Sequence, residues 1–167
     1  EEMLFKTDTD YAPWTIIEAM DRRFATVKVY TTVIKAMEDQ IEKVRRASDK
    51  KAEEGKEENK EERSQAEKEL EGLQVSILSR ADLSLHYTKE EYKKKLDKLQ
   101  KKMEKLHGEL YRKRIPVVLG FEGWDAGGKG GAIKRLTEKM DARGYVVNPT
   151  ASPNDIEKAH HYLWRFW

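Results

Sequence analysis

The stretch FEGWDAGGKGGAIKR, residues 121–135, decides the fold expected for this chain. It contains the spacing Gly-x-x-x-x-Gly-Lys, formed by Gly123, Gly128 and Lys129, which is the spacing of a phosphate-binding loop. Glycines let successive backbone N–H groups turn inward around phosphate oxygens, and the start of the following helix adds positive potential. The lysine supplies a mobile positive charge for a phosphoryl group. The alternative is a glycine-rich turn between a strand and a helix that binds nothing.

Two residues of this stretch depart from the usual phosphate loop. Gly130 stands where a serine or threonine normally ligates Mg²⁺, and it has no side chain to do so. Asp125 lies inside the loop, where a carboxylate beside bound phosphates is electrostatically costly unless a cation lies between them. We therefore expect Asp125 to help hold Mg²⁺ or to orient the attacking phosphate. The alternative is a turn residue that hydrogen-bonds its own loop.

The residues around the loop predict alternating strands and helices. Residues 115–121, IPVVLGF, are typical of a short buried strand, and a helix is expected over residues 131–142. A second strand is expected over residues 145–148, followed by a helix with Ser152 as its cap and Pro153 in its first position. This order indicates the start of an α/β fold with a parallel sheet.

Two long helices are predicted before the loop. One starts at Asp21, a suitable N-cap, and has apolar residues at steps of three and four from Phe24 to Val44. The other starts at a Thr88–Glu91 capping box and runs to about residue 111. Its apolar stripe fits either a coiled coil or packing against a neighbouring domain. The stripe consists of Tyr92, Leu96, Leu99, Met103, Leu106 and Leu110.

Composition bounds the class of protein. Charged residues make up 38% of the 167, which is more than an ordinary compact domain has, and many lie in a stretch of mixed sign between the two helices. The chain has no cysteine, which excludes disulfides, thiolate metal sites and a cysteine nucleophile. It has no apolar run near the roughly 20 residues that span a bilayer, and no signal peptide at its start, so we expect a cytoplasmic protein. The closing aromatic cluster HHYLWRFW suggests a piece of a longer chain.

The stretch PVVLGFEGWDAGGKGGAIKRLTEKMDARGYVV, continuing to HHYLWRFW, resembles polyphosphate kinase family 2. Members of this family are P-loop phosphotransferases related in fold to thymidylate kinase. The family patterns are FEGWDAAGKGG and DPRGY. In this chain Gly127 replaces an alanine of the first pattern, and Ala142 replaces the proline of the second. The helix with YKKKLDKLQKKMEKL is similar to the family's N-terminal helical segment. The resemblance implies an α/β fold with a P-loop kinase-type parallel sheet, incomplete here and preceded by long α-helices.

The resemblance also implies an organisation and an activity. Residues 7–29 are similar to the closing segment of a family domain. We therefore expect residues 1–46 to be the tail of a preceding domain, residues 47–80 a charged linker, and residues 81–167 the N-terminal half of a second domain. Such tandem members transfer the terminal phosphate of polyphosphate to AMP, giving ADP, with Mg²⁺. The alternatives are an ATP-dependent nucleotide kinase and a non-catalytic helical interaction module with a vestigial loop.

The family's functional residues carry over to matching positions. Asp125, Lys129 and Arg143 would be catalytic, and Asp125 would bind Mg²⁺ with a second carboxylate outside this chain, so the chain alone is expected to be inactive. The implied partners are polyphosphate and AMP or ADP, with no nucleic acid or membrane, in a homo-oligomer. Lys134, Arg135 and Arg165 have structural alternatives as exposed or stacking residues, and the two histidines His160 and His161 are expected to be packing or surface residues. The resemblance assigns phosphate or nucleotide binding to Gly123, Trp124, Gly127, Gly128, Gly130, Gly131, Lys134, Arg135 and Arg165.

Overall fold

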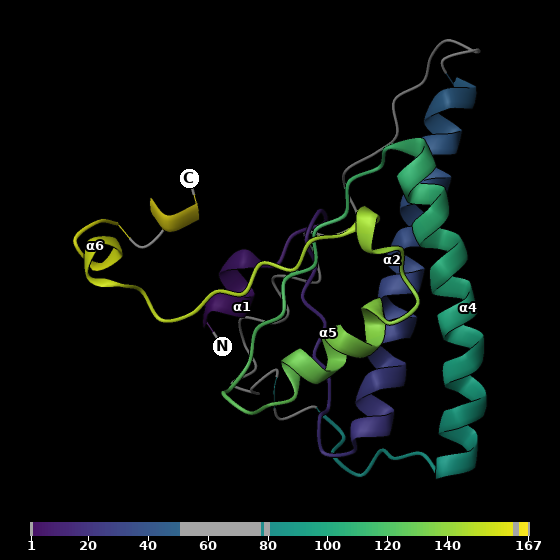
Figure 1. Cartoon of the computed structure of the whole chain (residues 1–167), viewed down its shortest axis with the longest axis horizontal. Coiled ribbons are helices and arrows are strands. Elements are labelled where there is room, and N and C mark those ends of the chain that lie inside the picture. Colours follow the sequence, from purple (N-terminus) through teal and green to yellow (C-terminus); the bar gives the residue numbers. More distant parts are fainter. Residues whose placement is uncertain (1, 51–77, 79–80, 162–163, 167) are drawn as a thin grey trace, which may run out of the picture.

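The computed structural model describes residues 2–50, 78, 81–161 and 164–166. Within these residues the protein is helical and has no strand (Figure 1). Two long helices stand side by side, and a shorter third helix leans against one of them (Figure 1). The α-helices are α1 (Glu2–Thr7), α2 (Arg22–Lys50), α4 (Lys89–Lys113), α5 (Lys129–Thr137) and α6 (Asp155–Lys158), and the 3-10 helices are η2 (Ala142–Gly144) and η3 (Trp164–Phe166).

The predicted start of α2 is confirmed. The Asp21 carboxylate accepts a hydrogen bond from the backbone N–H of Phe24 at 2.6 Å, which is the bond of an N-cap side chain. The helix continues to Lys50, so the first residues of the predicted charged linker are helical. The rest of that linker, residues 51–77 and 79–80, lies outside the described residues.

The predicted capping box of α4 is also confirmed. The Thr88 hydroxyl accepts from the Glu91 backbone N–H at 3.3 Å, and the Glu91 carboxylate accepts from the Thr88 backbone N–H at 3.0 Å. The helix ends at Lys113, where Arg114 turns into the left-handed conformation with φ of 54°. Local side-chain chemistry therefore fixes the start of the helix.

This box makes the stability of α4 depend on pH. The pKa of Glu91 lies below its ordinary value of 4.5 because the Thr88 hydroxyl and backbone N–H donate to its carboxylate. A lowered pKa stabilises the fold above the unfolded value, and the contribution is lost as the pH falls through the folded value. We expect Thr88→Ala to lower the melting temperature by about 2–4 °C near neutral pH and by less well below pH 4.5. Thr88→Ser, which keeps the hydroxyl, is the control. An equal shift at both pH values would contradict the coupling.

The helices α2 and α4 run parallel. At their starts, Arg23 Nη1 donates to the Tyr87 carbonyl oxygen at 2.9 Å, and farther along Lys102 Nζ donates to a Glu38 carboxylate oxygen at 2.9 Å. Both pairs are 64 residues apart in sequence, so the register between the helices is constant over this distance. The colour order in Figure 1 shows the same direction for both helices. The apolar stripe of α4 is thus a packing face against α2.

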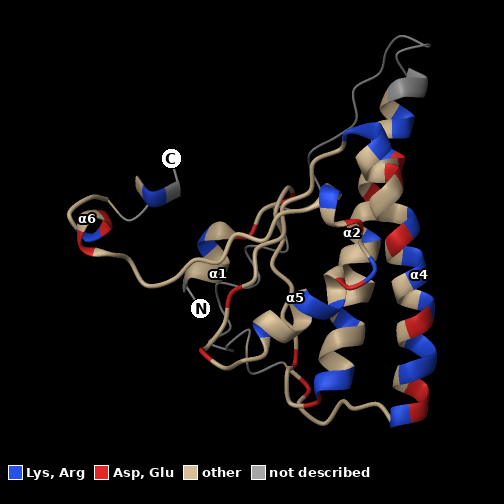
Figure 2. Cartoon of the chain, in the orientation of Figure 1, with Lys and Arg blue, Asp and Glu red and all other residues tan. Residues whose placement is uncertain are grey.

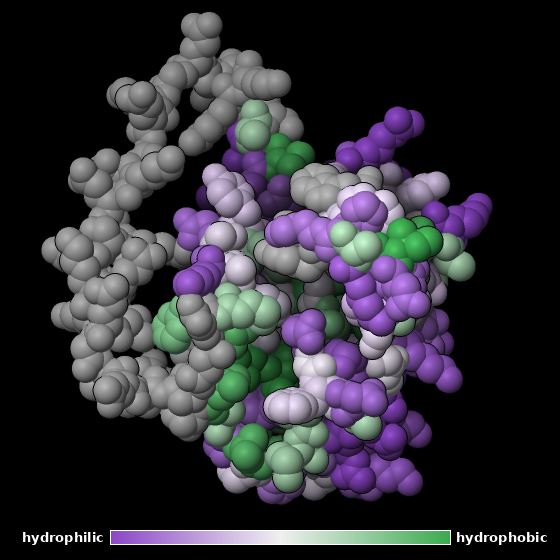
Figure 3. Space-filling view, turned by 90° about the vertical axis from the view of Figure 1, so that its left-hand side faces the viewer, coloured by the Kyte–Doolittle hydropathy of each residue, from purple (hydrophilic) through white to green (hydrophobic). Residues whose placement is uncertain are grey.

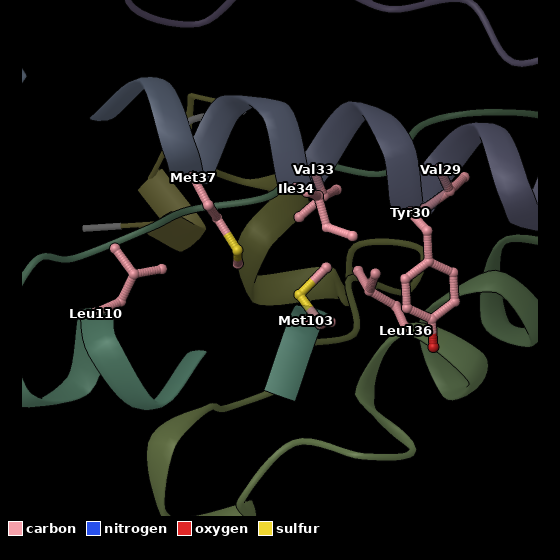
Figure 4. Packing of buried hydrophobic residues seen from close by; sticks show 8 residues of the cluster. All are labelled: Val29, Tyr30, Val33, Ile34, Met37, Met103, Leu110 and Leu136. Atoms are coloured by element: carbon pink, nitrogen blue, oxygen red, sulfur yellow. The ribbon is translucent and has the colours of Figure 1, made fainter. Parts of the chain in front are cut away.

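The core lies where α2, α4 and α5 meet. Met103 of α4 is fully buried, and Leu136 of α5 packs near the Tyr30 ring of α2 (Figure 4). The Tyr30 side chain is also buried, which raises the pKa of its phenol, and its hydroxyl donates to the backbone carbonyl of Arg135. This bond fixes α5 to α2. The core comprises Val29, Tyr30, Val33, Ile34, Met37, Met103, Leu110 and Leu136.

The two predicted strands are extended but unpaired in the described part of the chain. Residues 115–121 and 145–148 have no regular secondary structure, and Val118 and Val146 in them are 94% and 81% exposed. A strand is defined by hydrogen bonds to a neighbour, and neither segment is paired with one here. Figure 3, which faces the side that carries the chain ends in Figure 1, shows hydrophobic areas at the surface.

Two helix boundaries differ from the sequence prediction. The helix after the loop begins at Lys129 and ends at Thr137, whereas residues 131–142 were expected. It begins earlier because Gly128 accepts the first helical bond, from the Ala132 N–H at 3.0 Å. The last cap prediction was wrong as well. Asn154 caps α6, and it does so because Glu157 lies three residues later and completes a capping box.

Candidate functional site

The loop before α5 has the backbone that the glycines predict. Gly128 is the N-cap of α5 and lies in the left-handed region with φ of 88°, which glycine adopts without strain. The N–H of Gly127 donates to the Trp124 carbonyl oxygen at 3.1 Å and closes a turn. A Cβ on Gly127 would lie 2.9 Å from that oxygen, so this tight turn favours glycine at this position.

Lys129 reaches back over this loop. Its Nζ donates to the carbonyl oxygens of Gly123 at 2.5 Å and Trp124 at 2.7 Å. The structure thus brings three of the predicted site residues together, with the ammonium at the mouth of the loop. The Trp124 side chain is 91% exposed and points into open solvent. A phosphate at this mouth would meet the lysine charge and the helix N-terminus together.

The two carboxylates of the loop bind their own backbone. Asp125 Oδ1 accepts from the Ala126 N–H at 2.9 Å, and Glu122 Oε1 accepts from the Gly123 N–H at 3.0 Å. The Asp125 bond is the one expected of a turn residue, and it leaves the second carboxylate oxygen available. Within the described ranges no three His, Cys, Asp or Glu residues are grouped closely enough to hold a metal ion. Asp125 is therefore a candidate ligand that belongs to no such group among the described residues.

Arg143 is held by Asp141 in the short turn η2. Its Nη2 lies 2.6 Å from Asp141 Oδ2, and its Nε donates to both carboxylate oxygens. This guanidinium holds the pKa of Asp141 far below its usual range. The turn is seated on α4, because a Cβ on Gly144 would lie 2.5 Å from the ring of buried His107. The arginine side chain itself is 85% exposed.

The remaining predicted site residues are dispersed. Arg135 Nη1 donates to the Gly131 carbonyl oxygen at 2.7 Å, so its side chain lies along α5, while Lys134 is exposed. Arg165 lies 3.6 Å from Glu157, in the C-terminal segment that Figure 1 shows away from α5. The structure therefore does not bring Arg165 to the loop.

His160 behaves as the sequence predicts. Its ring stacks on that of Trp164 at a centroid distance of 4.3 Å, which is a packing contact. The larger omission of the sequence prediction is Tyr30. The apolar spacing placed Tyr30 or Thr31 on the buried face of a helix, but nothing in the spacing indicated a hydrogen bond to a carbonyl 105 residues later.

A glycine-rich turn that follows an extended segment and opens a helix at a lysine defines the phosphate-loop class of proteins. Comparison with known families places the chain within this class. The chain belongs to the polyphosphate kinase 2 (PPK2) family, whose sequence profile matches residues 1–45 and 86–167. The unmatched residues between these two ranges include most of the charged stretch.

Similar proteins carry names that agree with this family. The chain is 36% identical to a polyphosphate:AMP phosphotransferase of Pseudomonas syringae pv. tomato and 31% identical to one of Pseudomonas aeruginosa. Both matches cover 100% of this chain but 31% of the relative's length. An ADP-polyphosphate phosphotransferase of Rhizobium meliloti is 39% identical over 45% of this chain and 26% of its own length. No solved structure matches the chain significantly.

Among the described helices, none combines the length and the apolar character that crossing a bilayer requires.

Proposed function

We propose that the whole protein transfers the terminal phosphate of inorganic polyphosphate to AMP, which gives ADP and a polyphosphate chain one unit shorter. The observation that carries this proposal is the pairing of Lys129 with a phosphate-type loop in a chain that two polyphosphate:AMP phosphotransferases match over its full length. The activity belongs to those relatives by name, and its transfer to this protein rests on the family and on the loop.

In this proposal the loop binds the phosphoryl group that moves. Backbone N–H groups of the loop and the start of α5 surround the phosphate oxygens, and Lys129 exchanges its two carbonyl partners for them. A phosphate oxygen of AMP attacks the terminal phosphorus, and the bridging P–O bond to the rest of the chain breaks. Catalysis of this kind comes from positioning and charge neutralisation.

Asp125 and Arg143 have supporting roles. Asp125 offers an oxygen ligand of the kind that Mg²⁺ prefers, and its second oxygen is available for this while the first holds the turn. Mg²⁺, when bound, would neutralise charge on the phosphates. Arg143, exposed and oriented by Asp141, would contact phosphate or nucleotide. Gly130 contributes no ligand, so in this proposal the carboxylate of Asp125 takes over the metal-binding role of the hydroxyl that is absent at Gly130.

We further infer that residues 115–121 and 145–148 are neighbouring strands of a parallel sheet in the whole protein. Both segments are extended and rich in valine, and their exposed valine side chains would be buried in a sheet that other elements cover on both faces. The proposed division stays as the sequence predicts, with a domain tail over residues 1–46, a linker over residues 47–80 and the front of a second domain over residues 81–167.

Donor choice tests the function. We expect the purified whole protein to form ADP from AMP with long-chain polyphosphate and Mg²⁺, measured by chromatographic separation of the nucleotides. ATP at the same phosphate concentration is the comparison donor. Formation of ADP with ATP and not with polyphosphate would identify an ATP-dependent nucleotide kinase instead. No formation with either donor would favour an interaction module.

A further inference from the structure

Positive charge is concentrated on α4. Ten of its 25 residues are Lys or Arg and five are Asp or Glu, an excess of five positive charges. The whole chain has a net charge of only +2, so the rest of the chain is acidic on balance. Figure 2 shows the basic residues along the length of α4. Such asymmetry indicates an interaction with a polyanion.

Four lysines form a line on the exposed side of this helix, which we name the basic stripe: Lys94, Lys98, Lys101 and Lys105. Their steps of four, three and four residues place them on one face of an α-helix. Buried Met103 and Leu110 lie on the opposite face. All four stripe lysines are exposed. The stripe is about 17 Å long at the rise of an α-helix.

Two lysines of α4 outside the stripe pair with acidic residues, whereas most of the stripe lysines do not pair with any described residue. Lys102 pairs with Glu38 at 2.9 Å, and Lys113 pairs with Glu109 at 2.7 Å, both outside the stripe. Within the stripe, Lys101 pairs with Asp97 at 2.8 Å, and both side chains are largely exposed. Exposed pairs of this kind are weak and can exchange partners.

The other three stripe lysines have no ion pair with any residue that the structure describes; they are Lys94, Lys98 and Lys105. Among the described residues, none pairs with these charges, so mobile ions in solution can accompany them. A polyanion that replaces those ions gains binding free energy from their release. The stripe therefore has the charge and the exposure that binding to a linear polyanion requires.

We propose that the basic stripe binds the distal part of a long polyphosphate chain while its terminal phosphate occupies the loop at Lys129. This inference rests on the proposed function for the identity of the polyanion. Flexible lysine stems suit a linear chain with a negative charge on each phosphate, because they require no fixed geometry. A chain held at two places has a raised local concentration at the loop. The end of α5 contacts α4 through the Gln100–Glu138 hydrogen bond at 3.0 Å, whereas the start of α5, which carries Lys129, points away from α4 (Figure 1). A long chain is therefore needed to reach both places.

The test compares two triple variants of the chain with equal charge change. The first carries Lys94→Gln, Lys98→Gln and Lys105→Gln. The matched control carries Lys35→Gln, Lys43→Gln and Lys139→Gln, three lysines that are also exposed and also have no ion pair within the described ranges. Circular dichroism establishes that both variants fold. Calorimetric titration with long-chain polyphosphate, with tripolyphosphate and with single-stranded DNA gives the affinities.

We expect the stripe variant to bind long-chain polyphosphate about tenfold more weakly, with a salt dependence shallower by about 2 in log–log slope. Tripolyphosphate binding should be unchanged, and the control variant should bind like the unaltered chain. Equal losses of long-chain affinity in both variants would mean that binding depends on the net charge of the chain and not on the position of the lysines, and this would overturn the proposal. Unchanged long-chain binding in the stripe variant would overturn it too, as would a loss confined to single-stranded DNA.

Failure of this inference is distinguishable from failure of the proposed function. The titration needs neither AMP nor phosphoryl transfer, so it reports on the stripe alone. If the enzyme is active and its chain-length preference is the same with and without the stripe lysines, the proposed role of the basic stripe is overturned and the proposed function stands. Long-chain binding that depends on the stripe, in a protein that forms no ADP, would support the stripe and overturn the function.

Discussion

Replacement of Lys129 by alanine is expected to lower polyphosphate-dependent ADP formation by several orders of magnitude, on the order of 10³-fold or more. The side chain lies at the mouth of the loop, on the carbonyl oxygens of Gly123 and Trp124. Without it the loop keeps its glycines and its helix, but it loses a mobile charge that can follow the transferred phosphoryl group. The loss should appear in kcat more than in KM, because the charge is needed most in the transition state.

Steady-state kinetics of the whole protein measures this effect. Lys139→Ala is the matched control, since this lysine lies beyond the end of α5 and is exposed, and we expect it to retain full activity. Lys129→Arg separates charge from shape, because a planar guanidinium cannot follow the phosphoryl group as a compact ammonium does, and it should recover only part of the loss. Wild-type turnover in Lys129→Ala would remove the loop from the site.

Local features of the fold were predictable because they are formed by residues close in sequence. The Asp21 cap and the Thr88–Glu91 box each need only a side chain and a backbone N–H three residues away. The cap at Gly128, which has no side-chain hydrogen bond, was not predicted, and the helix after the loop begins two residues earlier than expected. The wrong cap at Ser152 has the same origin, since Asn154 competes within two residues and wins through its partner Glu157. Short-range competition limits such predictions to a few residues.

Strand pairing cannot be predicted from the local sequence in this way, because a strand forms hydrogen bonds with segments that are distant in the sequence. Residues 115–121 have the composition of a buried strand, yet Val118 is 94% exposed here. The parallel packing of α2 on α4 was likewise outside the reach of the pattern. Apolar stripes indicated that both helices bury a face, and they did not indicate which face meets which.

The site shows the same division between local and distant information. Gly123, Trp124 and Lys129 lie within one short motif, and the structure brings them together. Arg165 lies far along the sequence, and its distance from the loop could not be inferred from a motif. Tyr30, which fixes the helix that carries Lys129, belongs to a segment that the sequence assigns to another domain. Long-range supports of a site are therefore the part that sequence reasoning misses.

Replacement of Asp125 by asparagine is expected to lower the rate by several orders of magnitude, on the order of 10³-fold, although the loop keeps its shape. Asparagine retains an oxygen that can accept from the Ala126 N–H, so the turn made by Asp125 survives. What it removes is the negative charge. If Asp125 were only a turn residue, this variant would be close to wild type, so the substitution separates the two interpretations left open by the sequence.

The metal dependence of the variant decides what the charge does. We expect the Mg²⁺ concentration for half-maximal activity to rise in Asp125→Asn, because a neutral amide is a weaker ligand for a hard cation than a carboxylate is. Glu122→Gln is the matched control: its carboxylate also accepts from a neighbouring loop N–H, and glutamine keeps that bond. A similar loss in both variants would mean that total loop charge matters rather than a ligand at Asp125. Loss in Asp125→Asn alone, relieved in part by excess Mg²⁺, is the outcome that a metal-binding carboxylate requires, and it would explain why this loop tolerates Gly130 where others have a hydroxyl.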